Sequence, residues 1–143
     1  MGKLSKYAKL ETIYFCLRYG ELKEVIEDIE LTIHSPLTDQ DGSHSAGDGS
    51  TVETAAIKAM KYRDRINLIE KCTREVTAKN PVLYPYLLNA ITKEECTFDY
   101  LYMHGMPICR NAFYRYKDKL YTAIYTSMYE QNLKPIERED YTI

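Results

Sequence analysis

A stretch near the C-terminal end, MPICRNAFYRYKDKLY (106–121), combines side chains that can form hydrogen bonds with nucleic acid. At about 100° per residue, five polar side chains fall together on one side of a predicted helix. They are Arg110, Asn111, Tyr114, Arg115 and Asp118. Lys117 and Lys119 flank this side, where they can contact phosphates. Because arginine reads guanine and asparagine reads adenine in the major groove, the stretch predicts a DNA-reading helix.

The opposite side of the same helix is apolar, as a core-facing side should be. It carries Ala112, Phe113, Tyr116, Leu120, Ala123 and Ile124. We therefore expect a helix from about Arg110 to Tyr129 that packs through its rings and presents its guanidinium groups to water. Mixed charges on an exposed helix face are also common in proteins that bind nothing, so the preceding segments decide between the two interpretations.

The segments before this helix predict two shorter helices. Residues 83–91 form the first, and Thr92 with Glu95 matches the T-x-x-E capping box at the start of the second. His104-Gly105 is typical of a helix end. A short helix, a glycine-containing turn and a longer helix make a helix-turn-helix, in which the last helix enters DNA.

Two long helices are expected earlier in the chain. Residues 3–31 show helical periodicity with a slip near Gly20, which predicts a bend. The predicted apolar stripe of this helix consists of Leu10, Tyr14, Leu17, Leu22, Val25, Ile26 and Ile29. The composition of residues 35–50 is that of a flexible loop. Ser50 or Thr51 can then cap a second helix that ends near Asn80 and carries a heptad. The heptad positions are Ala55, Ala59, Tyr62, Ile66, Ile69, Thr73 and Val76.

The predicted fold class is therefore all-α, because no segment shows strand-like alternation. Residues 1–80 are expected to form an antiparallel helical hairpin for oligomerisation or partner contact. Residues 81–130 form the helix-turn-helix unit, and residues 131–143 are an acidic tail.

Composition and charge narrow the class of protein. The chain of 143 residues is 45% apolar and 28% charged, which is enough to build one core. The net charge is −2, yet residues 105–134 carry five Lys or Arg against two acids, and residues 51–80 carry seven against four. Two basic segments can therefore face a polyanion. The four cysteines lack metal or disulfide spacing, and no apolar run can span a membrane, so we expect a cytoplasmic protein with reduced thiols.

Two other groups of residues are weaker candidates for a functional site. His34, Asp39, Asp41, His44 and Asp48 cluster near the predicted loop, but they lack the later glutamate of a calcium loop. Cys109 at a helix start has His104 nearby, yet no orienting carboxylate can be assigned to the pair. We expect no metal, no cofactor and no catalytic activity.

The beginning of the predicted DNA-reading helix also resembles a known motif. Residues 108–117, ICRNAFYRYK, are similar to the I-S-R-x-x-V-x-x-I-K start of the recognition helix in region four of bacterial sigma factors, with Cys109 in place of the capping serine. The motif-bearing similarity covers residues 92–125. The layout also resembles the RinA- and ArpU-like late transcriptional activators of Gram-positive phages. This resemblance implies DNA contacts by Arg110, Asn111, Tyr114 and Arg115, phosphate contacts by Lys117 and Lys119, and transcriptional control in a bacterial host cytoplasm.

The leading expectation is a sequence-specific DNA-binding transcriptional regulator of phage or prophage type. Its partners would be double-stranded DNA and, through the hairpin, RNA polymerase or a second copy in a homodimer or higher oligomer. One alternative is a small terminase subunit for phage DNA packaging. The other is a helical protein-interaction module that uses the stripe Tyr121, Tyr125 and Tyr129.

Overall fold

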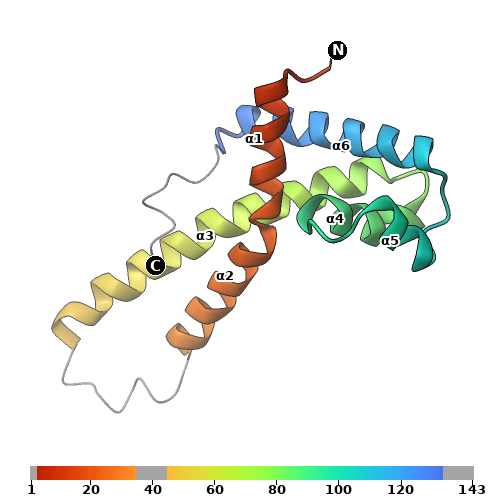
Figure 1. Cartoon of the computed structure of the whole chain (residues 1–143). Coiled ribbons are helices and arrows are strands. Elements are labelled where there is room, and N and C mark those ends of the chain that lie inside the picture. Colours follow the sequence, from red (N-terminus) through yellow and green to blue (C-terminus); the bar gives the residue numbers. More distant parts are fainter. Residues whose placement is uncertain (1–2, 35–44, 134–143) are drawn as a thin grey trace.

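The computed structural model describes residues 3–34 and 45–133 (Figure 1). All regular structure in these two ranges is helical, which confirms the predicted all-α class. The helices are α1 (Lys6–Leu17), α2 (Tyr19–His34), α3 (Ser45–Val76), the short 3₁₀ helix η2 (Pro81–Leu83), α4 (Tyr84–Thr92), α5 (Phe98–Met103) and α6 (Arg110–Glu130). None of the helices described here is long and apolar enough to cross a membrane.

The expected first helix consists of two helices that meet at Arg18, close to the bend predicted near Gly20. Ser5 caps the start of α1, because its hydroxyl accepts a hydrogen bond from the amide of Ala8 (3.2 Å). α2 then packs along α3, whereas α1 packs against α6 and α4 (Figure 1). The N-terminal helix is thus in contact with the C-terminal one.

Because α1 packs against α6 and α4, its buried face differs from the one that the sequence predicted. Leu10 and Tyr14, two positions of the predicted apolar stripe, are 38% and 63% exposed. The buried positions of α1 are instead Ala8, Thr12, Phe15 and Cys16. The prediction for α1 is wrong because it assumed one helix that packs along α3 over its whole length.

α3 is the longest helix and carries the predicted heptad. Ala59, Tyr62, Ile66, Ile69 and Thr73 are all buried, so the heptad is confirmed over its central part. The helix starts at residue 45 rather than at residue 50, so the loop expected over 35–50 is wrong for its last six residues. Each residue added to a formed helix gains a hydrogen bond, which offsets the roughly 1 kcal/mol that each glycine costs. Residues 35–44 lie outside the described part of the chain.

The start of α5 differs from the capping-box prediction. Thr92 is the last residue of α4, and its hydroxyl donates to the carbonyl of Leu88 (2.7 Å). Thr97 caps α5 instead, by accepting from the amide of Tyr100 (3.3 Å). A threonine hydroxyl can bond either to the preceding turn or to the following one, so the T-x-x-E pattern alone selected the wrong residue.

The core lies where α1, α3, α4 and α6 meet. Phe113 is 1% exposed and its ring packs against that of Phe98, with 5.5 Å between centroids. Where α2 meets α3, the Tyr19 hydroxyl donates to Glu70 (2.5 Å). Fully buried members of the core include Leu22, Ile69, Leu83, Leu87, Ile91, Met106, Leu120, Ile124 and Met128. The last helix is therefore anchored along one side.

Candidate nucleic-acid interface

The turn between α5 and α6 depends on Gly105, which has a φ of 101°. The Met106 amide donates to the carbonyl of Leu101 (3.0 Å), and the Gly105 amide donates to that of Tyr102 (3.2 Å). This is the Schellman arrangement that ends a helix. The side chains of Leu101 and Met106 are both buried beneath it. The predicted helix end at His104-Gly105 is confirmed, and the turn sets where α6 begins.

α6 begins at Arg110, with Cys109 at its cap position. The Cys109 thiol is exposed and forms no capping hydrogen bond. The observed helix ends at Glu130, one residue beyond the predicted end, and is about 31 Å long at 1.5 Å per residue. Its first turns lie beside α5, at the end of the molecule away from α2 (Figure 1).

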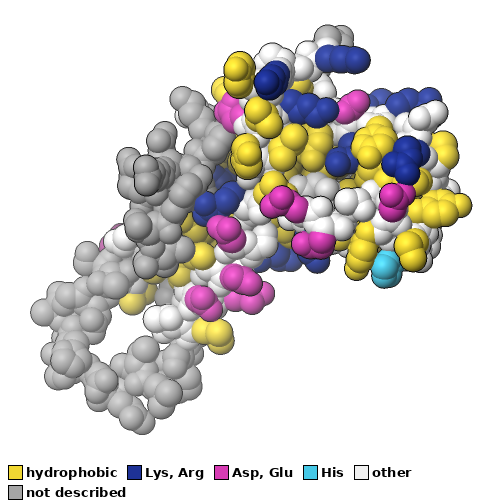
Figure 2. Space-filling model, viewed as in Figure 1, with side chains coloured by type: hydrophobic (Ala, Val, Ile, Leu, Met, Phe, Trp, Pro, Cys, Tyr) yellow, Lys and Arg dark blue, Asp and Glu magenta, His cyan; other side chains and the backbone are white. Residues whose placement is uncertain are grey.

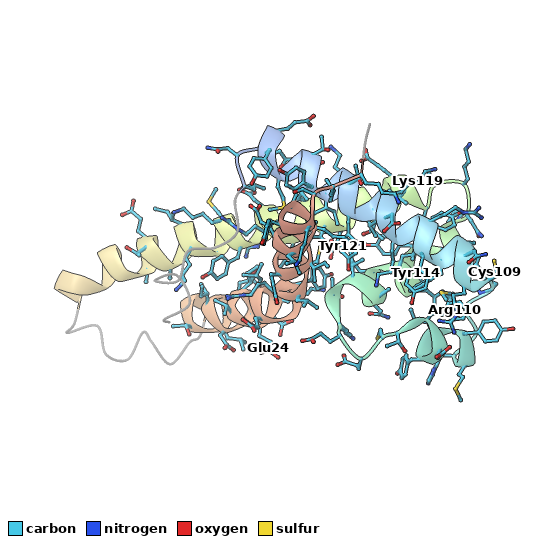
Figure 3. All side chains as sticks on the ribbon, turned by 45° about the horizontal axis from the view of Figure 1, so that its top comes forward. Glu24, Cys109, Arg110, Tyr114, Lys119 and Tyr121 are labelled. Atoms are coloured by element: carbon cyan, nitrogen blue, oxygen red, sulfur yellow. The ribbon has the colours of Figure 1, made fainter. Side chains whose placement is uncertain are left out.

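A row of polar side chains runs along the open side of α6. Asn111, Arg115 and Lys119 are all exposed and follow one another at intervals of four residues. This spacing places them on one face, about 6 Å apart along the helix axis. None of the three forms a hydrogen bond or an ion pair with another residue of the described ranges. Figure 3 shows Lys119 projecting from α6 away from α5. These groups are free to meet a ligand.

Arg110 is also exposed, but it has a protein partner. Its Nη2 donates to Oδ1 of Asp99 in α5 (2.8 Å), and its guanidinium lies over the ring of Phe98, 4.7 Å from the centroid. Figure 3 places Arg110 at the end of α6 next to α5. An exposed ion pair contributes at most about 1 kcal/mol, so this one can open when a phosphate competes for the guanidinium.

Lys117 does not extend from the flank of α6 in the way that the sequence suggested. Its side chain is half-buried, and its ammonium lies 5.5 to 5.9 Å from the ring centroids of Phe113, Tyr114 and Tyr121. Burial lowers the pKa of Lys117, with a smaller effect in the same direction from Lys9. The structure thus separates Lys117 from the row formed by the other three polar residues.

α1 limits the open surface of α6. Lys9 of α1 pairs with Asp118 (3.5 Å), and both side chains are exposed. Tyr114, one turn earlier, is exposed and its ring lies edge-on to that of Phe113. All seven residues selected from the sequence therefore lie in the first half of α6, but Asp118 and Lys117 are turned toward α1 and the groove beside it.

The packing of α1 on α6 also interrupts the predicted tyrosine stripe. Tyr121 was placed on the outer face, but it is only 5% exposed, so that placement is wrong. Tyr129 donates to Glu11 of α1 (2.8 Å), and this hydrogen bond raises the pKa of Tyr129 to about 12. The Tyr125 ring lies against that of Tyr129, with centroids 4.8 Å apart. The stripe was misjudged because the sequence did not show α1 crossing α6.

The structure adds no supporting geometry for the two weaker candidate sites, the metal ligands near the predicted loop and the pair of Cys109 and His104. The candidate metal ligands Asp39, Asp41 and His44 lie outside the described residues, as do the side chains of His34 and Asp48. Within the described ranges no three His, Cys, Asp or Glu side chains are grouped as metal ligands would be. The ring of His104 stacks on Tyr100 (4.2 Å between centroids), and its Nδ1 lies 2.7 Å from the Tyr100 carbonyl.

Two features of this region were missed at the level of sequence. Asp99 was not recognised as a partner of Arg110, although the two are eleven residues apart across a predicted turn. Tyr102 and Met103 of α5 are 60% and 83% exposed, beside the start of α6. A small set of exposed apolar residues on a short helix is a signal that a periodicity search of longer windows cannot detect.

Comparison with known protein families, with curated proteins and with solved structures found no match for the chain. The function is therefore inferred from the geometry of α5, the turn and α6.

Proposed function

We propose that the protein is a sequence-specific DNA-binding regulator of transcription, in which α5, the turn at Gly105 and α6 act as a helix-turn-helix. The observation that carries this proposal is the free row of Asn111, Arg115 and Lys119 on the open side of α6. An amide, a guanidinium and an ammonium at one-turn intervals supply two base-reading groups and one phosphate contact.

In this arrangement the first half of α6 lies in the major groove. Arg115 and Asn111 read base edges, Lys119 contacts one strand, and Arg110 joins them once its pair with Asp99 opens. Tyr114 contributes an exposed ring and hydroxyl beside them. Lys117 and Asp118 remain at the edge of the interface, on the side where α1 lies. In other helix-turn-helix proteins the first helix crosses the DNA backbone, and here Tyr100 and Tyr102 on α5 are exposed and could take that role.

The helices α2 and α3, which pack along each other, are the proposed site of self-association or of contact with RNA polymerase. One α6 contacting a few phosphates binds weakly, and regulators of this kind reach specific affinity by placing two recognition helices on two half-sites. Glu24, Glu27 and Asp28 form an exposed acidic face on α2, and Figure 3 shows Glu24 pointing outward. Such a face suits a basic protein surface and repels DNA. A strict monomer in sedimentation at micromolar concentration would contradict the dimer.

The phage or prophage setting is proposed on the resemblance of residues 92–125 to sigma region four and to phage late-gene activators. Of the residues that this resemblance implies as DNA contacts, Asn111, Arg115 and Lys119 are exposed on α6 and unpaired within the described part of the chain, whereas Lys117 is half-buried.

Selection from a pool of random duplexes with the full chain tests the proposal. We expect recovery of one short motif, bound with lower affinity by Arg115→Ala and Asn111→Ala. Lys23→Ala is the matched control, because Lys23 is an exposed cation on the acidic helix α2. Recovery of no motif, or equal losses for all three variants, would contradict specific reading.

A protein-interaction module is the second candidate, and one observation favours it. Tyr102 and Met103 expose apolar surface next to α6, which is typical of contacts with another protein. Capture of a protein partner that is lost when Met103 is substituted and retained when Arg115 is substituted would support this alternative.

A further inference from the structure

A groove of about 370 Å³ lies between α1, the α4–α5 connection and the first half of α6. Most of the residues that line it are apolar or aromatic, with Tyr14 from α1, Phe98 from α5, and Tyr114 and Tyr121 from α6, while its exposed surface is polar and apolar in about equal parts. Figure 2 shows hydrophobic side chains with Lys and Arg among them over α1 and the adjoining end of α6. The groove is beside the proposed DNA-reading row and does not include it.

α1 leaves apolar side chains uncovered at this groove. Leu10 and Tyr14 both line it, and both belong to the stripe that the sequence marked as core. Leu17 of the same stripe lines it as well. An apolar stripe that the chain's own core does not cover, bordering a hollow, is surface that a bound molecule can cover.

Lys117 gives this groove its chemical preference. Its ammonium faces three aromatic rings and has no carboxylate partner in an ion pair anywhere in the described ranges. The neighbouring acid, Asp118, is paired with Lys9. The other two charged residues that line the groove, Lys93 and Glu94, are opposite in charge to each other, so together they add no net charge. The half-buried ammonium is therefore the unbalanced charge of the site.

We infer that the groove binds a small organic anion with an aromatic or aliphatic body, whose carboxylate pairs with Lys117. The volume falls within the range of small-ligand pockets, which are mostly apolar with a few polar groups that orient the ligand. A carboxylate would supply the partner that Lys117 lacks, and the body would cover Leu10 and Tyr14. The limited volume and the single unbalanced ammonium favour a small molecule over a long partner helix. The inference does not depend on DNA binding.

The test uses two probes that differ only in charge, 2-naphthoate and 2-naphthalenemethanol. Each is titrated into ¹⁵N-labelled full-length protein without DNA, and amide shifts are followed by NMR. We expect naphthoate to bind about tenfold more tightly than the alcohol. The shifts should cluster at residues 10–17 and 93–98. Lys117→Met should remove the preference for the acid, whereas Lys119→Met, on the open side of the same helix, should keep it.

Equal affinity for the two probes, retention of the preference in Lys117→Met, or no binding of either probe at millimolar concentration would overturn the inference. Tyr14→Ala provides a second variant at an exposed side chain, where folding is not at risk. It should weaken both probes and keep their ratio. An unchanged affinity in Tyr14→Ala would place the probe outside the groove and would also overturn it.

Discussion

Arg110 at the first position of α6 is held by Asp99 in the first turn of α5, with 2.8 Å between Nη2 and Oδ1. The same guanidinium lies over the ring of Phe98. The pair links the two helices of the proposed reading unit, and it also occupies one of the cations that the unit offers to DNA. Asp99 thus competes with phosphate for Arg110.

Asp99→Asn should strengthen DNA binding. The substitution removes a carboxylate that repels phosphate and releases Arg110, a change of about 1 kcal/mol, or roughly fivefold in affinity. One additional cation should also steepen the salt dependence by about one phosphate contact. Fluorescence anisotropy of a labelled duplex at several salt concentrations measures both effects. Weaker binding by Asp99→Asn would show that the pair itself positions α6.

Arg115→Ala should reduce specific DNA binding by about 1–3 kcal/mol while leaving stability nearly unchanged. The reason is that Arg115 is exposed and has no partner in the described chain, so its removal breaks no contact within the protein. Anisotropy gives the affinity and urea unfolding gives the stability. An equal loss of affinity for specific and random duplexes would instead assign Arg115 to phosphate contact alone.

Phe113→Ala should destabilise the fold by about 3–5 kcal/mol, because it leaves a cavity at a fully buried position next to Phe98. Tyr114→Ala is the matched control, since it removes the neighbouring ring from an exposed position. Urea denaturation followed by circular dichroism should show a large fall in midpoint for the first variant and a small one for the second. Similar effects of the two variants would contradict the assignment of Phe113 to the buried face of α6 and of Tyr114 to its exposed face.

The parts of the fold that could be predicted are those set by local pattern. The heptad of α3 alternates three and four residues, so its buried face at Tyr62 and Ile66 follows from helical geometry alone. The start of α6 was predicted correctly because Gly105 ends the helix before it. These signals lie within a few residues of the feature that they determine.

The parts that could not be predicted depend on contacts distant in sequence. Tyr121 is buried because α1 crosses α6, and the sequence contains no mark of that crossing. Leu10 and Tyr14 look like core residues but border a groove for the same reason. The candidate site was therefore located on the correct helix, while the roles of Lys117 and Asp118 required the neighbouring helix to be seen.

Gly105→Ala should destabilise the protein by about 1–2 kcal/mol, because an alanine at a φ of 101° is strained. A Cβ at this position would also lie 3.3 Å from the hydroxyl oxygen of Tyr86. Since the turn sets the direction of α6, DNA affinity should fall further than that of a variant equally destabilised elsewhere. Leu88→Ala, at a partly buried position in α4, offers a comparison of this kind. Equal affinity losses at equal stability would contradict a positioning role for the turn.

The dependence of binding on salt tests the central claim most directly. Titration of the full chain with a duplex carrying its selected motif, at increasing potassium chloride, gives the slope of log Kobs against log salt. With four to six phosphate contacts for each α6, we predict a slope of roughly −4 to −5 for one copy, and a shallower slope for a variant that lacks Lys119. A slope near zero, or no difference between selected and random duplexes at any salt concentration, would contradict the proposal that α6 reads DNA.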